Sequence, residues 1–256
     1  MGKSSKNRDR REMVERMQRE AKARERRRTL IVIAVCAVVA VIIVGAAGWS
    51  IWQDQRERDE IAGRELADIG AAATDAGCGP IQEEPATGAG DHVESGPVQY
   101  DVTPPSFGPH RPTTADAGIH FYNVEDRPEV AQLVHNLEHG WTIVWYADDI
   151  DEAQLKQLRA TSEKFDAFGS DPKYNVIFAP WTDDDGEGIP DGQSIAFAHW
   201  SVHQPEFDPS FYDSGEVDSW GQSQTCTDFS GAALEDFMNR YPYDDAPEGY
   251  LWHQTN

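Results

Sequence analysis

His135 and His139 carry the clearest chemical signal in the chain, within the string HNLEHG at residues 135–140. On a helix, the side chains of residues i and i+4 project from one face, so the two imidazoles can bind the same metal ion. Gly140 predicts that the helix ends directly after them. Two ligands do not complete a site, so the remaining ligands must come from other segments.

A proline-rich loop offers the next candidate ligand, His110, at the end of the string PPSFGPH. Its three prolines fix the backbone and its glycine allows a tight turn, so it can present one imidazole rigidly, although a plain structural turn is the alternative. His92 lies in a second loop, and His199 and His203 flank the end of a predicted strand. We expect His110 first and His92 next to complete a site with the helical pair. An all-imidazole site that faces outward suits zinc or copper rather than magnesium.

The same string fits the H-x-x-E-H pattern of inverted zincins, in which Glu138 would be the general base that acts on a zinc-bound water. The match is short, and no clear downstream helix offers the further glutamate ligand that such peptidases require. A structural interpretation is also open, with the histidines bonded to backbone carbonyls where helix meets strand. No G-x-S-x-G string or phosphate-binding glycine loop occurs, so the sequence does not identify the chain as an enzyme.

A second type of metal site is indicated by the acidic string DDDGEGIPD at residues 183–191. Carboxylates at alternate positions, followed by one more after a glycine turn, resemble the start of a calcium loop: Asp183, Asp185, Glu187 and Asp191. The string resembles the loops of calcium-binding repeats, but it occurs once. The alternative is an acidic, solvated turn. A bound calcium ion would stabilise the hairpin rather than catalyse a reaction.

Hydrophobic periodicity predicts the elements that position these residues. In order, we expect a strand, a helix, a strand, a helix, two strands and a helix, at residues 118–124, 127–139, 141–147, 150–168, 174–180, 193–200 and 230–241. This β-α-β-α-β-β-α order predicts an α/β (or α+β) domain, and it matches a thioredoxin-like topology. The strands at 141–147 and 174–180 would run parallel, with the strand at 193–200 antiparallel beside them. No C-x-x-C string occurs, so this topology implies no disulfide exchange.

An apolar segment near the N-terminus predicts a single-pass transmembrane helix at residues 29–52, since it has no charged side chain from Leu30 to Trp52. Arginines precede the segment and acids crowd its end, so the basic tail at 1–28 would be cytoplasmic at the plasma membrane. A polar juxtamembrane helix at 53–70 and an extracytoplasmic globular domain at 71–256 would follow.

Charge is divided sharply along the chain. The first 28 residues hold 12 of the 22 Lys and Arg residues, which leaves 10 basic and 40 acidic residues downstream. Phosphates would repel such an acidic domain, so we expect no nucleic-acid partner. By charge, we expect its partners to be cations and proteins, including a membrane-protein partner.

Cysteine usage also fits an extracytoplasmic domain. Cys36 lies in the predicted span, and Cys78 and Cys226 are the two cysteines downstream of it. An oxidising compartment would join them in a disulfide that closes a long loop. The alternative is a pair of free thiols available to a soft metal.

These features together resemble a known family. The N-terminal anchor, Gly77-Cys78, His92-Val93, the PPSFGPH loop and the HNLEHG string are similar to a bacterial envelope family catalogued as domain of unknown function 3105. The resemblance covers roughly residues 70–200 and implies that Cys78 and the histidines of these motifs lie near one another, with Glu138. The family usually has Thr-Ser-Gly where this chain has Ser106-Phe107-Gly108, so the polar lining of the loop is altered here. The resemblance implies no reaction.

The favoured hypothesis is a membrane-tethered domain that binds a transition metal through His135, His139, His110 and His92, in envelope metal handling or as an accessory to a membrane complex. One alternative is a non-catalytic interaction module in which the histidine motifs only shape the fold. The other is a zinc-dependent hydrolase with Glu138 as its base. The first and third hypotheses both require His110 or His92 to lie close to the helical pair.

Overall fold

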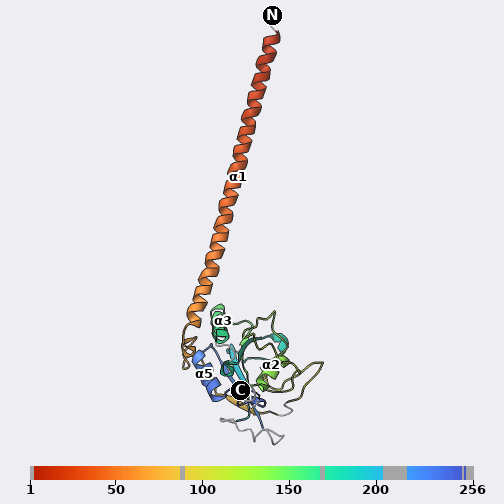
Figure 1. Cartoon of the computed structure of the whole chain (residues 1–256), viewed down its shortest axis with the longest axis vertical. Coiled ribbons are helices and arrows are strands. Elements are labelled where there is room, and N and C mark those ends of the chain that lie inside the picture. Colours follow the sequence, from red (N-terminus) through yellow and green to blue (C-terminus); the bar gives the residue numbers. More distant parts are fainter. Residues whose placement is uncertain (1–2, 87–89, 168–170, 204–217, 250, 252–256) are drawn as a thin grey trace. The chain divides into compact units, whose positions relative to one another are not determined.

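The structure is a computed structural model that describes residues 3–86, 90–167, 171–203, 218–249 and 251. It divides into two compact units, residues 1–56 and 57–256. The first unit consists of most of helix α1, which runs from Lys3 to Ala62 (Figure 1). Within the described residues, α1 is the one helix that is long and apolar enough to cross a membrane, by length and composition. It ends at Ala62, earlier than the predicted polar helix to residue 70, and a short 3-10 helix follows at Leu66–Asp68.

A five-stranded mixed sheet forms the centre of the second unit, in the order β1-β5-β4-β2-β3. The strands are β1 (Gln82–Pro85), β2 (Thr142–Ala147), β3 (Val176–Trp181), β4 (Ile195–Ser201) and β5 (Trp220–Cys226). As predicted, β2 pairs in parallel with β3 and antiparallel with β4. β5 pairs antiparallel with both β4 and β1. The mixed α/β class is confirmed, whereas the thioredoxin-like order stays a prediction.

Three parts of the predicted order were wrong, and the first is that β1 was not predicted, because its sequence QEEP has no apolar alternation. Residues 118–124 do not form a strand, because they meet β3 at one parallel bridge, Phe121 with Phe178, before the chain turns away. β5 was missed because its sequence, WGQSQTC, is mostly polar and lacks apolar alternation. β5 lies between β1 and β4, whose backbones supply the hydrogen bonds that hold it.

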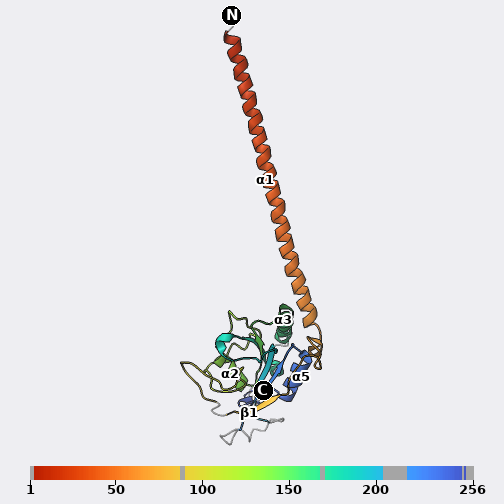
Figure 2. The ribbon, with the colours of Figure 1, turned by 180° about the vertical axis from the view of Figure 1, so that it is seen from behind.

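In the part of the chain that the structure describes, helices cover both faces of the sheet. α3 (Glu152–Ala167) and α5 (Gly231–Arg240) pack on one face, and α2 (Val130–Glu138) packs on the other. Figures 1 and 2 show α2 and α5 on opposite sides of the strands. Side chains alternate along β2, so Val144 and Tyr146 join the first face while Ile143 and Trp145 join the second.

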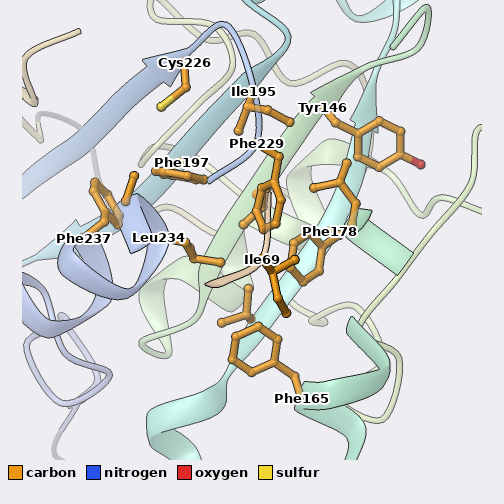
Figure 3. Close-up of a cluster of buried hydrophobic side chains, with 14 of the residues drawn as sticks. Ile69, Tyr146, Phe165, Phe178, Ile195, Phe197, Cys226, Phe229, Leu234 and Phe237 are labelled. Carbon is orange, nitrogen blue, oxygen red and sulfur yellow. The ribbon is translucent and has the colours of Figure 1, made fainter. Parts of the chain in front are cut away.

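The face under α3 and α5 holds a large aromatic core, shown in Figure 3. Phe178 of β3 and Phe197 of β4 meet Phe165 from α3 and Phe237 from α5, and each is at most 1% exposed. Full burial of one such side chain contributes about 1.5–3 kcal/mol. The Cys78 and Cys226 sulfurs lie 2.03 Å apart, at disulfide distance, on this same face.

Candidate metal centre

Helix α2 places three chemically active side chains at one end of the sheet. Its apolar residues, Leu133, Val134 and Leu137, are fully buried against the sheet. The 3.6-residue period then leaves His135 and Glu138 to face the loops that cover the helix, and both are less than 10% exposed. The helix ends where the sequence predicted, with His139 at its C-cap and Gly140 at φ +85°.

Two loops that are far apart in sequence from α2 close over these side chains. His92 and His110 form an isolated parallel bridge, in which Val93 N–H donates to the His110 carbonyl at 2.7 Å. The His110 N–H donates in turn to the Asp91 carbonyl at 3.0 Å. Farther along, the Arg111 N–H donates to a carbonyl of α2. These backbone bonds bring the two imidazoles together, with ring centres 4.8 Å apart.

The four side chains converge on one point. Each offers a ligand atom, and all of these atoms lie within 4.8 Å of one another: His92, His110, His135 and Glu138. The Nε2 atom of His110 is 3.0 Å from Oε2 of Glu138, and Nε2 of His135 is 3.8 Å from the same oxygen. Ligands bonded to zinc at about 2.0–2.2 Å have separations of this size in a tetrahedral shell. The group can therefore hold one metal ion.

The hydrogen-bond partner of His110 determines which of its nitrogens can bind a metal. Nδ1 of His110 is 2.9 Å from the carbonyl oxygen of Gly108, which can only accept, so Nδ1 carries the proton. In the neutral ring, the lone pair is then on Nε2, which points toward Glu138. Nε2 of His110 and Oε2 of Glu138 are both buried, and neither has a hydrogen-bond partner besides the other. Two such acceptor atoms 3.0 Å apart require a shared cation between them, either a metal ion or a proton.

Electrostatics within the group keep His135 neutral. Burial, together with the positive charge that His139 and His110 can carry, lowers the pKa of His135 to about 4. Burial opposes charge on Glu138 as well, but the neighbouring histidines outweigh it and hold the pKa of this carboxyl below its usual value. At neutral pH the group therefore presents the uncharged imidazole of His135 beside the carboxylate of Glu138, which are the forms that bind metals. His110 differs from His135, because burial, which lowers its pKa, is outweighed by its hydrogen bonds to Glu138 and Gly108, which raise it.

His139 belongs to a second, adjacent group. Its Nε2 atom lies 3.0 Å from Nε2 of His135, and its Nδ1 atom lies 3.2 Å from Oε2 of Glu248. Ligand atoms of Glu138, His139 and Glu248 all lie within 4.8 Å of one another. Sequence reasoning missed Glu248, because it is one acid in the polar segment after α5 and has no local pattern to distinguish it.

The remaining candidates lie elsewhere. Cys78 is not in the group, since it bonds Cys226 and packs against the opposite face of the sheet. His199 is fully buried, with its nitrogens near the carbonyls of Trp141 and Asp245. His203 stacks on Trp220, with ring centres 4.2 Å apart.

The predicted calcium loop has a different arrangement from a cation cage. Asp185 accepts two bonds from Arg127 at 2.7 and 2.9 Å, and it caps a short 3-10 helix by accepting from Thr182. In the part of the chain that the structure describes, neither group of converging ligands includes Asp183, Glu187 or Asp191. The calcium loop stays a prediction, and nothing below depends on it.

Comparison with known proteins gives a family and no activity. A family model described as a protein of unknown function, DUF3105, matches residues 92–252, which include every member of both metal-ligand groups. No curated protein and no solved structure matches the chain.

Proposed function

The chain belongs to the DUF3105 family of proteins of unknown function, and we propose that it is a membrane-tethered domain that binds a transition-metal ion through His92, His110, His135 and Glu138. The proposal differs from the expected all-histidine set in one ligand, because Glu138 stands in the position expected for His139. One observation carries it. The Nε2 atom of His110 and the Oε2 atom of Glu138 face each other at 3.0 Å in a buried space, and neither has another hydrogen-bond partner.

The donor set indicates the type of metal. Three imidazoles and one carboxylate suit zinc or copper(II), whereas magnesium and calcium prefer oxygen ligands. The ligands come from two loops and a helix that are fixed by backbone bonds and by Asn136, whose side-chain oxygen accepts from the Ala115 N–H at 2.9 Å. A site with this much support is already formed before the metal arrives, which favours tight binding.

The position of Glu138 argues against the hydrolase alternative. A general base must reach a metal-bound water, but the carboxylate of Glu138 lies among the ligand atoms, and the residue is 5% exposed. A role in metal binding accounts for it without an open cleft. We therefore favour metal storage, sensing or transfer, or support of a neighbouring membrane complex, over hydrolysis.

Tethering follows from α1. In our proposal, residues 29–52 anchor the chain in the plasma membrane, residues 1–28 face the cytoplasm, and the metal-binding domain faces outward. At one end of the apolar stretch, the rings of Trp49 and Trp52 lie close together, and the Arg56 guanidinium lies 4.9 Å from the centre of a Trp52 ring. Aromatic and basic residues of this kind are typical of a membrane interface.

The test is elemental analysis of the full chain, purified in detergent without chelators and without a histidine tag. We expect near-stoichiometric zinc or copper in the parent protein, and its loss from a folded His110→Ala/His135→Ala variant. A matched control is His203→Ala, which removes a half-exposed histidine outside both groups. A folded parent that contains no metal and takes up no added zinc or copper would rule out the proposal and leave the interaction module as the better hypothesis.

A further inference from the structure

The ligands at this end of the sheet outnumber what one ion needs. We propose that the centre takes a second divalent metal ion, bound by His139 and Glu248 and joined to the first ion by the carboxylate of Glu138. This inference rests on the proposed function, since it adds a second ion to the same centre. It makes the centre dinuclear, with Glu138 as the bridging ligand.

Two overlapping sets of converging atoms carry the inference. One set is His92, His110, His135 and Glu138, the other is Glu138, His139 and Glu248, and they share only Glu138. Because His139 and Glu248 converge with Glu138 but not with the whole first set, the donors form two shells rather than one. A carboxylate has two oxygens with about four lone-pair sites, so Glu138 can bind an ion on each side. Carboxylates bridge ions about 3.5–4 Å apart in two-metal sites.

The segment that supplies Glu248 is fixed in place beside α2. The Glu248 N–H donates to the Glu138 carbonyl at 3.0 Å, so the backbones of the two acids are bonded directly. Earlier in the segment, Asp245 is 3% exposed and accepts from the Ser201 hydroxyl at 2.7 Å and from the Val202 N–H at 3.2 Å. These bonds hold the segment at the end of the sheet where β4 ends, so Glu248 is positioned rather than free on the surface.

Close backbone contact gives a second indication that this position is specific. A Cβ atom on Gly140 would lie 1.8 Å from the carbonyl oxygen of Tyr243. Only glycine, at φ +85°, therefore lets the segment approach the end of α2 closely enough for Glu248 to reach His139.

The charges in the second set favour a cation. Glu138 and Glu248 bring two carboxylates to one imidazole, and the side chain of Glu138 is only 7% exposed. Ligand atoms of the two acids lie within 4.8 Å of each other. Two carboxylates this close repel each other unless a positive charge lies between them. The second set has two carboxylates and one imidazole, so its donors are harder than those of the first set. It is also more open to solvent, since the side chains of His139 and Glu248 are 24% and 33% exposed. Zinc fits both sets, and the ion in the second set should exchange faster.

The experiment is a zinc titration of the metal-free full chain in detergent, with bound zinc counted by native mass spectrometry. We expect two zinc ions per parent chain and one per chain in Glu248→Gln and in His139→Ala. The matched control, Glu235→Gln, changes an exposed glutamate on α5 and should keep both ions. With cobalt(II), the bridged pair in the parent should couple magnetically, so that its paramagnetic resonance signal per ion is weaker than in Glu248→Gln.

The outcomes separate this inference from the proposed function. One zinc ion in the parent and one in Glu248→Gln would overturn the second ion and leave the first intact. No zinc in the parent would overturn both proposals. A folded Glu248→Gln chain that binds no zinc would also overturn the inference, because Glu248 would then be needed for a single site.

Discussion

Nε2 of His110 and Oε2 of Glu138 lie 3.0 Å apart and are buried, with no other hydrogen-bond partner, although residues 111–137 separate them in the sequence. Burial of two acceptor atoms that face each other costs free energy. Because backbone hydrogen bonds hold both segments in place, the atoms cannot move apart, and we infer that a cation between them normally offsets this cost. A proton is the competing cation. The predictions below separate the metal from the proton and connect the centre to the parts of the fold that hold it.

Glu138→Gln should keep the fold and lose the metal. The glutamine amide can donate to Nε2 of His110, so the metal-free variant should be at least as stable as the metal-free parent. Its zinc affinity should fall by more than roughly 100-fold, because a loss up to that size is expected when a residue only hydrogen-bonds a metal ligand and does not bind the metal itself. Competition with a chromogenic chelator measures the affinity, and thermal unfolding with and without zinc measures the stability. Equal zinc affinity in variant and parent would show that Glu138 is not a ligand.

Gly140→Ala should separate α2 from the segment that carries Glu248. The new Cβ would overlap the Tyr243 carbonyl, so the segment must move. The free-energy cost of this movement adds to the conformational cost of about 1–2 kcal/mol for a non-glycine residue at positive φ. We expect a loss of unfolding free energy of roughly 3 kcal/mol or more, together with loss of the second zinc ion. Urea unfolding and zinc counting measure the two effects.

The control for this variant is Gly192→Ala. Gly192 has a similar φ of +79° but no atom within 4 Å of its Cβ position. It should show the conformational cost alone and keep its full zinc content. If both variants lose the same stability and neither loses zinc, the contact with Tyr243 does not position Glu248.

The fold was predictable where hydrophobic periodicity was strong. α2, β2, α3, β3, β4 and α5 lie within a few residues of their predicted ranges, because each buries an apolar face. β5 was not predictable from its own residues, since its place depends on hydrogen bonds to β1 and β4. A strand of this kind is specified by its neighbours rather than by its composition.

The candidate site was also predictable only where the signal lies in the local sequence. His110 could be inferred from the rigid loop that ends in it, and the pair His135 and His139 from helical spacing. Glu138 could be seen in the same string, but its place among the converging side chains depends on how the loops close over α2. Glu248 gave no signal, because its approach depends on tertiary contacts at Gly140 and Asp245. Sequence therefore indicated the residue types of the candidate site, and tertiary packing determined which of their side chains converge.

Removal of the bond between Cys78 and Cys226 should destabilise the domain without removing the metal. The two cysteines are 148 residues apart in sequence, so the bond restricts the unfolded chain strongly. We expect Cys78→Ser/Cys226→Ser to lose about 2–5 kcal/mol of unfolding free energy. Since the bond lies on the face opposite α2, folded variant and parent should bind the same amount of zinc. Cys36→Ser is the control and should match the parent, whereas zinc loss in the folded double variant would connect the bond to the centre.

Protonation of His199 should weaken the fold in mild acid. Burial is the largest influence on this group and lowers its pKa to about 4, against an ordinary value of 6.5, although the carbonyls of Asp245 and Trp141 oppose the shift. The folded state therefore binds fewer protons than the unfolded state between these values. The stability contribution is complete above about pH 6.5 and is lost as the pH falls toward 4. The loss should be roughly 3 kcal/mol.

The measurement is the urea unfolding free energy of the metal-free parent and of His199→Gln, at pH 7.5 and at pH 4. The variant has no titrating ring, so its loss between the two pH values should be smaller than that of the parent by about the same 3 kcal/mol. His135 also has a pKa near 4 and contributes a loss of the same sign in both proteins, so the difference between them isolates His199. Equal losses in the two proteins would mean that the buried ring of His199 accepts a proton without cost, and that His135 and the carboxylates account for the acid sensitivity.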